Sequence, residues 1–334
     1  MVDSPAWASS NMTTLEASYQ GSLIADALAM PIHWYYNREA IDADYPDLSS
    51  YRAPLPQHPD SILWRSQYKP VNEKADILHD QARFWGQRNI HYHQNLRAGD
   101  NTVNFQLARA LHDHVCEQGY DPTTWVELYI KLMRTPGWHR DTYVEEYHRA
   151  FFNRYAEGNN ILKCGISDEH IGGLATVPAL LAALPAGDHR QTIKTHVALT
   201  HRHSNVLRAA DCLTRLLGLI SEGQPLREAL MHAAGDWFST CKATDWARQP
   251  DRVIIGRKLS PACYIDQSFP ASLYLAWKYH DDFPAAVIAN AMVGGDNCHR
   301  GAVVGSLVAA EVMRDSGEGP SFEDSSKRKA GGLD

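Results

Sequence analysis

The sequence lacks an excess of basic residues and any long apolar run. Lys and Arg number 32 against 39 Asp and Glu, and the resulting net charge of −7 argues against non-specific binding to nucleic acid or to an anionic membrane. No stretch reaches the roughly 18 consecutive apolar residues of a membrane span. The first ten residues do not show a signal-peptide pattern. We therefore expect a cytoplasmic protein with no membrane partner.

Paired cysteines and alternating strand patterns are also scarce. The six cysteines are scattered without a C-x-x-C pair, which argues against a zinc ribbon or a disulfide framework and favours reduced thiols. Apolar residues instead recur at helical spacing, for example over 15–30, 123–132 and 204–220. No repeat or linker divides the chain. We predict a single compact all-α domain over residues 13–313, an N-terminal tail over 1–12 and a disordered tail over 314–334.

The most distinctive stretch is Met292–Ala310. It begins as a glycine turn, Gly294-Gly295, continues with Asp-Asn-Cys-His at 296–299, and then becomes apolar, with Gly301 and Gly305 one helical turn apart. Adjacent glycines allow a sharp turn, and small residues allow a helix to lie close to a neighbour. The start of such a helix favours anions. The stretch predicts a reactive cluster at the start of a buried helix, or else a turn whose polar residues only cap.

Gly99-Asp100-Asn101-Thr102 has the same form: a glycine turn, acidic and amide groups, then a helix from Val103. Two such helix starts can converge on one cation or one phosphate. We therefore expect Asp100 and Asp296 to share one cleft. Asp26 lies within the apolar pattern of the first helix, and a buried carboxylate there must be hydrogen-bonded. The proline-rich segment 43–74 is expected to be a long irregular loop that covers a pocket.

Histidines lie at several expected ends of helices. His33 follows the first helix. His201 and His203 precede Ser204, which is predicted to cap the helix that runs to Ile220. Such histidines can bind metal or substrate, or can belong to solvated loops. The pair Gly172-Gly173 predicts close packing or a backbone approach to a ligand.

Four segments resemble motifs of the ADP-ribosylglycohydrolase family. The first-helix pattern G-x-x-x-G-D-A-x-G-x-P is similar to residues 21–31, and the metal motif T-D-D-T to residues 99–102. The motif T-H-x-H-P is similar to residues 200–204, and G-G-D-T-D-T-x-G-A-I-x-G-A-L to residues 294–307. The resemblance implies an all-α fold and hydrolysis of an ADP-ribosyl or related N- or O-ribosyl glycosidic bond. It also implies a small-molecule or ADP-ribosylated substrate and a divalent metal, Mg²⁺ or Mn²⁺.

The resemblance also implies roles for individual residues. The expected catalytic residues are Asp100, Asp296 and His299. The expected metal ligands are Asp100, Asn101, Thr102, Asp296 and Asn297. The expected substrate contacts are His33, His201, His203, Gly172, Gly173 and Cys298.

Several positions depart from the family motifs. Asn101 stands for the second Asp of the early motif, and Cys298 and His299 stand for an Asp and a Thr of the late motif. Cys and His suit softer metals than Mg²⁺. This altered form resembles the jellyfish J-crystallin and selenoprotein-like branch. Three alternatives follow: a ribosyl glycosidase, a hydrolase or transferase with Cys298 as nucleophile, or a non-catalytic crystallin-type binding or structural protein.

Overall fold

A computed structural model describes residues 12–322 of the chain. Within this range the regular structure is helical, and the only β-type pairings are isolated bridges such as the one between Gln57 and Ile90. The predicted all-α fold is therefore confirmed. The helices are α1 (Thr14–Ala29), α2 (Arg38–Asp44), α3 (Val103–Gln118), α4 (Pro122–Arg134), α5 (Glu146–Ala156), α6 (Val177–Ala183), α7 (Arg190–Ala198), α8 (Ser204–Ser221), α9 (Leu226–Ala233), α10 (Thr240–Trp246), α11 (Asp251–Val253), α12 (Ile265–Lys278), α13 (Phe283–Met292) and α14 (Asn297–Ser316).

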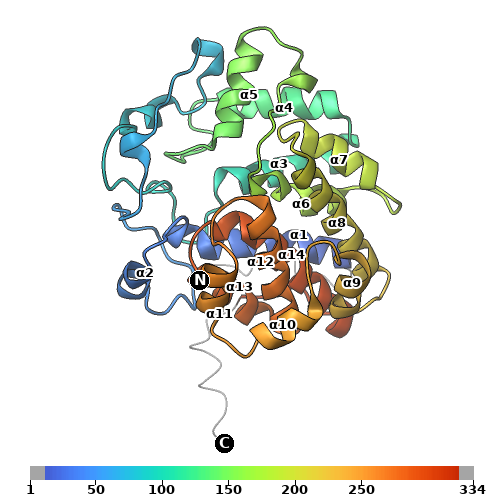
Figure 1. Ribbon diagram of the computed structural model, residues 1–334. Helices are drawn as coiled ribbons and strands as arrows, with labels where there is room; N and C mark the ends of the chain where they lie inside the picture. The colour runs from blue at the N-terminus through green and yellow to red at the C-terminus, as the bar shows by residue number, and fades with distance from the viewer. Residues whose placement is uncertain (1–11, 323–334) are drawn as a thin grey trace, which may run out of the picture.

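Helices α1 and α14 lie side by side in the middle of the molecule (Figure 1) and form the most extensive helix pair of the described chain. A Cβ atom added to Gly305 would lie 2.3 Å from the carbonyl oxygen of Gly21 and 2.8 Å from the Cβ of Ala25. The two backbones therefore touch, which only glycine allows at these positions. The close approach predicted from the glycine spacing in this stretch is confirmed. Helices α12 and α13 pack against α14 as well.

Helix α8 begins at Ser204, so its cap lies one residue earlier than predicted. The cap is His203, whose Nδ1 accepts a hydrogen bond from the backbone N–H of Asn205 at 3.3 Å. The prediction that Ser204 caps this helix is wrong, because an imidazole nitrogen can serve as the acceptor that a Ser oxygen usually provides. The buried face of α8, including Val206, Leu213 and Leu217, then packs into the main core.

The segment between α2 and α3 is irregular, apart from short 3₁₀ turns. It runs along one edge of the molecule from α2 to α5 (Figure 1). Two buried imidazoles of this segment contact the backbone that follows α1. His58 Nε2 lies 2.7 Å from the carbonyl oxygen of His33, and His91 Nε2 lies 2.9 Å from that of Pro31. The segment thus covers His33, as a pocket-covering loop would.

The C-terminal helix continues past Met313 to Ser316, where Gly317 ends it in the left-handed conformation with φ of 72°. Beyond it, the ring of Phe322 packs on Tyr51 at 5.6 Å. The remainder of both predicted tails, 1–11 and 323–334, lies outside the described residues. A search of the described helices finds none that is both long and apolar enough to cross a bilayer.

Candidate functional site

The glycine turn ahead of α14 places Asp296 in the interior. Gly294 and Gly295 have φ of 73° and 67°, and a Cβ on Gly295 would lie 2.1 Å from the carbonyl oxygen of Pro261. The N–H of Gly295 donates to the carbonyl of Tyr35 at 2.7 Å, and the N–H of Trp34 donates back to Gly295 at 2.8 Å. These bonds join the turn to the chain after α1 and bring Asp296 beside His33.

Arg300, one turn into α14, fixes the same turn. Its guanidinium is fully buried and donates to Asn290 Oδ1 and to the carbonyl oxygens of Asn290 and Gly294, each at 2.8 Å. A buried guanidinium requires such partners. Because they are neutral groups of α13 and the glycine turn, Arg300 anchors the backbone that carries Asp296.

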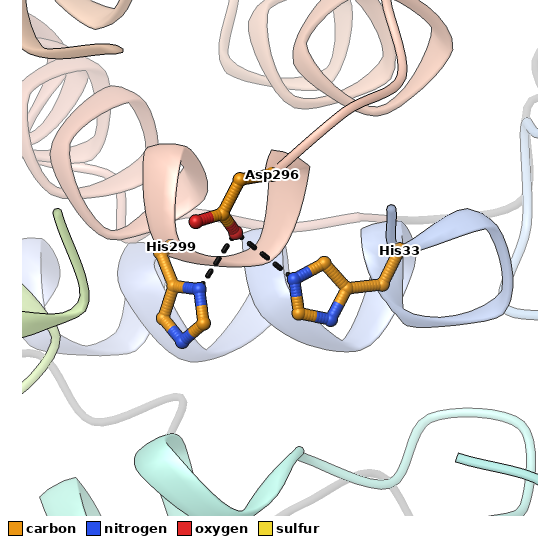
Figure 2. A group of neighbouring side chains, drawn as sticks. All are labelled: His33, Asp296 and His299. Atoms are coloured by element: carbon orange, nitrogen blue, oxygen red, sulfur yellow. Dashed lines mark hydrogen bonds and ion pairs between the residues drawn. The ribbon is translucent and has the colours of Figure 1, made fainter. Parts of the chain in front are cut away.

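The centre of the site is Asp296 between two imidazoles (Figure 2). Its Oδ1 accepts hydrogen bonds from His299 Nδ1 at 2.6 Å and from His33 Nε2 at 2.9 Å. The three side chains are at most 1% exposed. Burial alone would raise the pKa of Asp296, but His299 and His33 hold it well below its usual range. Asp296 is therefore ionised at neutral pH.

Glu145 lies on the other side of His299. Its Oε1 is 3.2 Å from His299 Nε2 and accepts from Asn104 Nδ2 at 3.0 Å, while Asn104 Nδ2 and His299 Nε2 lie 2.8 Å apart. The two nitrogens thus converge on one carboxylate oxygen. Burial alone would lower the pKa of His299, but Asp296 and Glu145 raise it to about 10. Because two carboxylates flank the ring, we assign His299 as the protonated member.

Two oxygens of this site have no hydrogen-bond partner. They are Asp296 Oδ2 and Glu145 Oε2, both buried. The nearest ionisable neighbour of Asp296 Oδ2 is His170 Nε2 at 3.5 Å, on a side chain that is 11% exposed. Buried polar atoms are rarely left unpaired, so a ligand or water molecule is expected there.

The early motif does not reach this centre. Asp100 Oδ2 accepts from the N–H of Arg97 at 2.8 Å and from Arg140 at 3.2 Å, and its side chain is 36% exposed in a surface cavity of about 450 Å³. None of these partners contacts Asp296. The expectation that Asp100 and Asp296 share one cleft is therefore not met, because a local turn and a surface ion pair hold Asp100 outside.

Asn101 and Thr102 instead satisfy Asp26. Asn101 Nδ2 donates to Asp26 Oδ2 at 3.0 Å, and the N–H and hydroxyl of Thr102 donate to the two oxygens at 2.9 and 2.7 Å. The prediction that Asp26 must be hydrogen-bonded is confirmed. A second carboxylate at the start of α3 is Asp141, which accepts a hydrogen bond from the N–H of Val103 at 2.6 Å.

Neither Asn297 nor Cys298 points to the centre. Asn297 Nδ2 donates to the carbonyls of Ala291 and Ile32, and the Cys298 thiol lies 3.7 Å from the carbonyl oxygen of Asp26. Burial and the negative charges of Asp26 and Asp296 raise the pKa of Cys298 well above its usual value. This environment stabilises the thiol and not the thiolate, which argues against Cys298 as a nucleophile.

The remaining residues that were expected to contact substrate lie outside this centre. A Cβ on Gly172 would lie 2.6 Å from the hydroxyl of Tyr147, and one on Gly173 would lie 2.9 Å from the ring of His201. The glycines therefore allow the rings to pack. His201 is buried against Tyr147, with an unpartnered Nε2. His203 lies away from the centre, with its Nε2 3.6 Å from Glu169 at the surface.

Sequence analysis missed the carboxylates of Asp141 and Glu145. Both lie between α4 and α5, in a segment without any matched motif. Their four-residue spacing is the one signal that they share a side of the chain. His93 and His170 also lie outside the motifs matched in the sequence.

Three groups of the described side chains are close enough to hold a metal ion: His33–Asp296–His299, Glu145–His170–His299 and His170–Cys263–Asp296. In the first group the contact of 2.6 Å between His299 and Asp296 is a hydrogen bond, since two ligands of one metal lie roughly 3 Å apart or more at bond lengths near 2.0–2.1 Å, and His33 Nε2 lies 2.9 Å from the same oxygen. The other two groups require His170, whose Nδ1 accepts from the N–H of Gly172 at 2.8 Å. Its proton is therefore on Nε2, the atom that would have to bind the metal.

These donor sets do not fit a pair of Mg²⁺ ions. Magnesium is held by oxygen atoms in octahedral geometry, whereas the groups offer mostly imidazole nitrogen and a thiol. The carboxylate and threonine oxygens expected as ligands are at the surface or bonded to Asp26.

The fold and this centre define a class: an all-α protein with a buried histidine–carboxylate site. The sequence model of the ADP-ribosylglycohydrolase family matches residues 14–312, and the chain belongs to this family, one of glycosidic hydrolases. A solved structure described as "ADP-ribosylglycohydrolase-related protein complex" superimposes with a TM-score of 0.55 at 18% identity, over 91% of this chain and 89% of that chain, which shows a shared fold. No curated protein matches. The likeness to the J-crystallin branch stays a prediction.

Proposed function

We propose that the protein hydrolyses an ADP-ribosyl or related N- or O-ribosyl glycosidic bond at Asp296 and Glu145. The observation that carries this proposal is the pair of unpartnered oxygens, Asp296 Oδ2 and Glu145 Oε2, in a site where both carboxylates are buried. Burial alone would raise the pKa of Glu145, but His299 lowers it below its usual range. Two ionised carboxylates suit a ribose ring that gains positive charge as its bond breaks.

The reaction needs a base, a charge-stabilising group and a path to the bond. The attacking water gives a proton to a free carboxylate oxygen while its own oxygen bonds to the anomeric carbon and the bond from that carbon to the leaving group breaks. The leaving group takes up a proton from solvent, and the carboxylate later returns its proton to solvent. His299 holds both carboxylates in place. His170 Nε2–H can donate to a substrate hydroxyl but cannot act as the acid, because its Nδ1 is occupied by the N–H of Gly172. His170, which is 11% exposed, and half-buried Cys263 are the members of this cluster nearest to solvent.

The Mg²⁺ or Mn²⁺ implied by the resemblance has no part in this proposal, because the donor atoms do not fit it. A crystallin-type structural role accounts less well for the site, since such a role needs no unpartnered buried oxygens. The substrate is a small molecule or an ADP-ribosylated macromolecule, and the shape of the site does not select one ribosyl conjugate.

The test is release of free ADP-ribose from ribosyl conjugates of arginine, serine, nucleic acid and small molecules, followed by chromatography. Asp296→Asn and Glu145→Gln should each lower turnover by about 10²- to 10⁴-fold with the fold intact by circular dichroism. The matched control, Asp100→Asn, removes a surface carboxylate and should retain turnover. Hydrolysis of none of the conjugates by folded protein, or full activity in Asp296→Asn, would reject the proposal.

A further inference from the structure

Two buried carboxylates, Asp141 and Asp296, are joined by a chain of two imidazoles. Asp141 Oδ1 lies 2.7 Å from His93 Nδ1, His93 Nε2 lies 2.7 Å from His33 Nδ1, and His33 Nε2 lies 2.9 Å from Asp296 Oδ1. No side chain of the four is more than 4% exposed. The rings of His33 and His93 are nearly parallel, with an interplanar angle of 2°. The chain therefore has three consecutive hydrogen bonds, all of them buried.

Three hydrogen bonds require three protons. A neutral imidazole has one N–H, so two neutral imidazoles supply only two protons. An ionised carboxylate supplies none. The short contact between His93 Nε2 and His33 Nδ1 needs a proton from one ring and a lone pair from the other. The chain must therefore hold one proton more than two neutral histidines do.

The position of this proton follows from the neighbours of each ring. Asp296 already has His299 as an ion-pair partner at 2.6 Å, whereas His93 is the ion-pair partner of Asp141 at 2.7 Å, and burial lowers the pKa of His33 to about 3 although Asp296 opposes that shift. His33 is therefore neutral, with its proton on Nε2 towards Asp296, and its Nδ1 is an acceptor. His93 must then donate from both nitrogens, to His33 and to Asp141.

We infer that His93 is a buried imidazolium whose two N–H groups donate to Asp141 and to His33. The hydrogen bond to His33 fixes the tautomer in which His33 Nε2–H donates to Asp296. His91, two residues earlier, differs in kind: its Nδ1 accepts from the backbone N–H of His93 at 3.0 Å. It is a neutral ring that orients the backbone. Asp141 also accepts from the N–H of Val103, which ties the chain of imidazoles to the start of α3.

This assignment makes His93 and Asp141 positioning residues. Because His33 is held as the Nε2–H donor, Asp296 keeps Oδ1 occupied and turns Oδ2 to the unpartnered position. The positive charge of His93 also balances Asp141 inside the fold. The effect of His93 and Asp141 on catalysis rests on the proposed function, whereas the protonation state of His93 does not.

The test is nuclear magnetic resonance of the full chain labelled with ¹⁵N-histidine, near neutral pH. Both ring nitrogens of His93 should show the shifts of an imidazolium, and His33 should show one protonated nitrogen, Nε2. Through-bond correlation assigns the rings in the wild type, so the result does not depend on a variant that folds. Neutral-ring shifts for His93, or a proton on Nδ1 of His33, would overturn the inference.

Variants separate this inference from the proposed function. His93→Gln should remove the imidazolium signals and change the His33 tautomer, whereas His91→Gln should leave the His33 signals as they are. If hydrolysis is measured, Asp141→Asn should lower kcat with little change in KM, because the residue acts through Asp296. An absence of hydrolysis would reject the proposed function and leave the resonance result standing. An active enzyme with a neutral His93 would reject the inference alone.

Discussion

The Nδ1 atom of His299 lies 2.6 Å from the Oδ1 atom of Asp296, three residues before it and just ahead of α14. The other ring nitrogen of His299 faces Glu145 at 3.2 Å. One imidazole therefore connects the start of the last helix to the segment before α5. The site depends on this link, because it compensates the charge of two buried carboxylates.

Removal of this imidazole should destabilise the fold. We expect His299→Gln to lower the free energy of unfolding by about 3–5 kcal/mol, because it leaves Asp296 and Glu145 buried without a cation. Urea denaturation measures the change. Asp100→Asn, which removes the exposed ion pair with Arg140, should cost less than about 1 kcal/mol. Equal small losses in the two variants would contradict an ion pair at His299.

The contact between α1 and α14 should tolerate no added methyl group. Gly305→Ala places a Cβ 2.3 Å from the backbone oxygen of Gly21, and we expect a loss of about 1–3 kcal/mol because backbone atoms must move. The matched control is Gly218→Ala in α8, where nothing lies within 4 Å of the new Cβ. It should stabilise by about 0.5–1 kcal/mol through helix propensity. Thermal unfolding of both variants would show opposite shifts, and shifts of one sign would refute the packing argument.

Stability should fall on both sides of neutral pH. Burial lowers the pKa of His196 to about 3 and that of His148 to about 4. The unfolded chain protonates these two histidines below about pH 6.5, whereas the folded chain does so only near pH 3–4. Their contribution to the free energy of unfolding is therefore complete above about pH 6.5 and is lost as the pH falls towards 3–4. For His299, burial opposes a raised pKa, but Asp296 and Glu145 raise it to about 10. Its contribution is complete below about pH 6.5 and is lost as pH rises through 10.

Urea midpoints across this pH range test the prediction. His196 lies apart from the catalytic cluster, between the hydroxyls of Tyr120 and Thr176. His196→Gln should therefore flatten the acid limb and leave the alkaline limb unchanged. An acid limb of the same slope in this variant would show that the buried neutral histidine does not contribute.

Removal of divalent metal should leave the protein unchanged. The nitrogens of His33 and His299 are all engaged, and the proton of His170 occupies the atom that would bind a metal. Thermal unfolding should show the same midpoint with EDTA and with Mg²⁺, Mn²⁺ or Zn²⁺. A metal at about a hundred times its Kd would add roughly 2.7 kcal/mol, a shift that is easily measured. A saturable rise with any of these ions that Asp296→Asn abolishes would refute the metal-free site.

Local patterns were reliable where one segment supplied all the information. The apolar periodicity of residues 15–30 and 204–220 corresponds to α1 and α8, with ends displaced by one residue. The glycine spacing at 301 and 305 indicated a close helix neighbour, because a residue without a side chain leaves room on the helix surface for another backbone. The surface position of Asp100 was not predicted, because its ion pair with Arg140 is a contact that no local pattern gives.

By itself, the sequence determined the helical class, the membership in a family through four ordered motifs, and the burial of the last helix. The tertiary structure alone decided which acids meet. Asp141, Glu145 and His93 join Asp296 from segments separated by more than a hundred residues, while Asp100 is left at the surface. The reason is physical: helix formation depends on neighbours within a few residues, whereas the charge state of a buried carboxylate depends on whatever side chains the fold brings within about 3 Å.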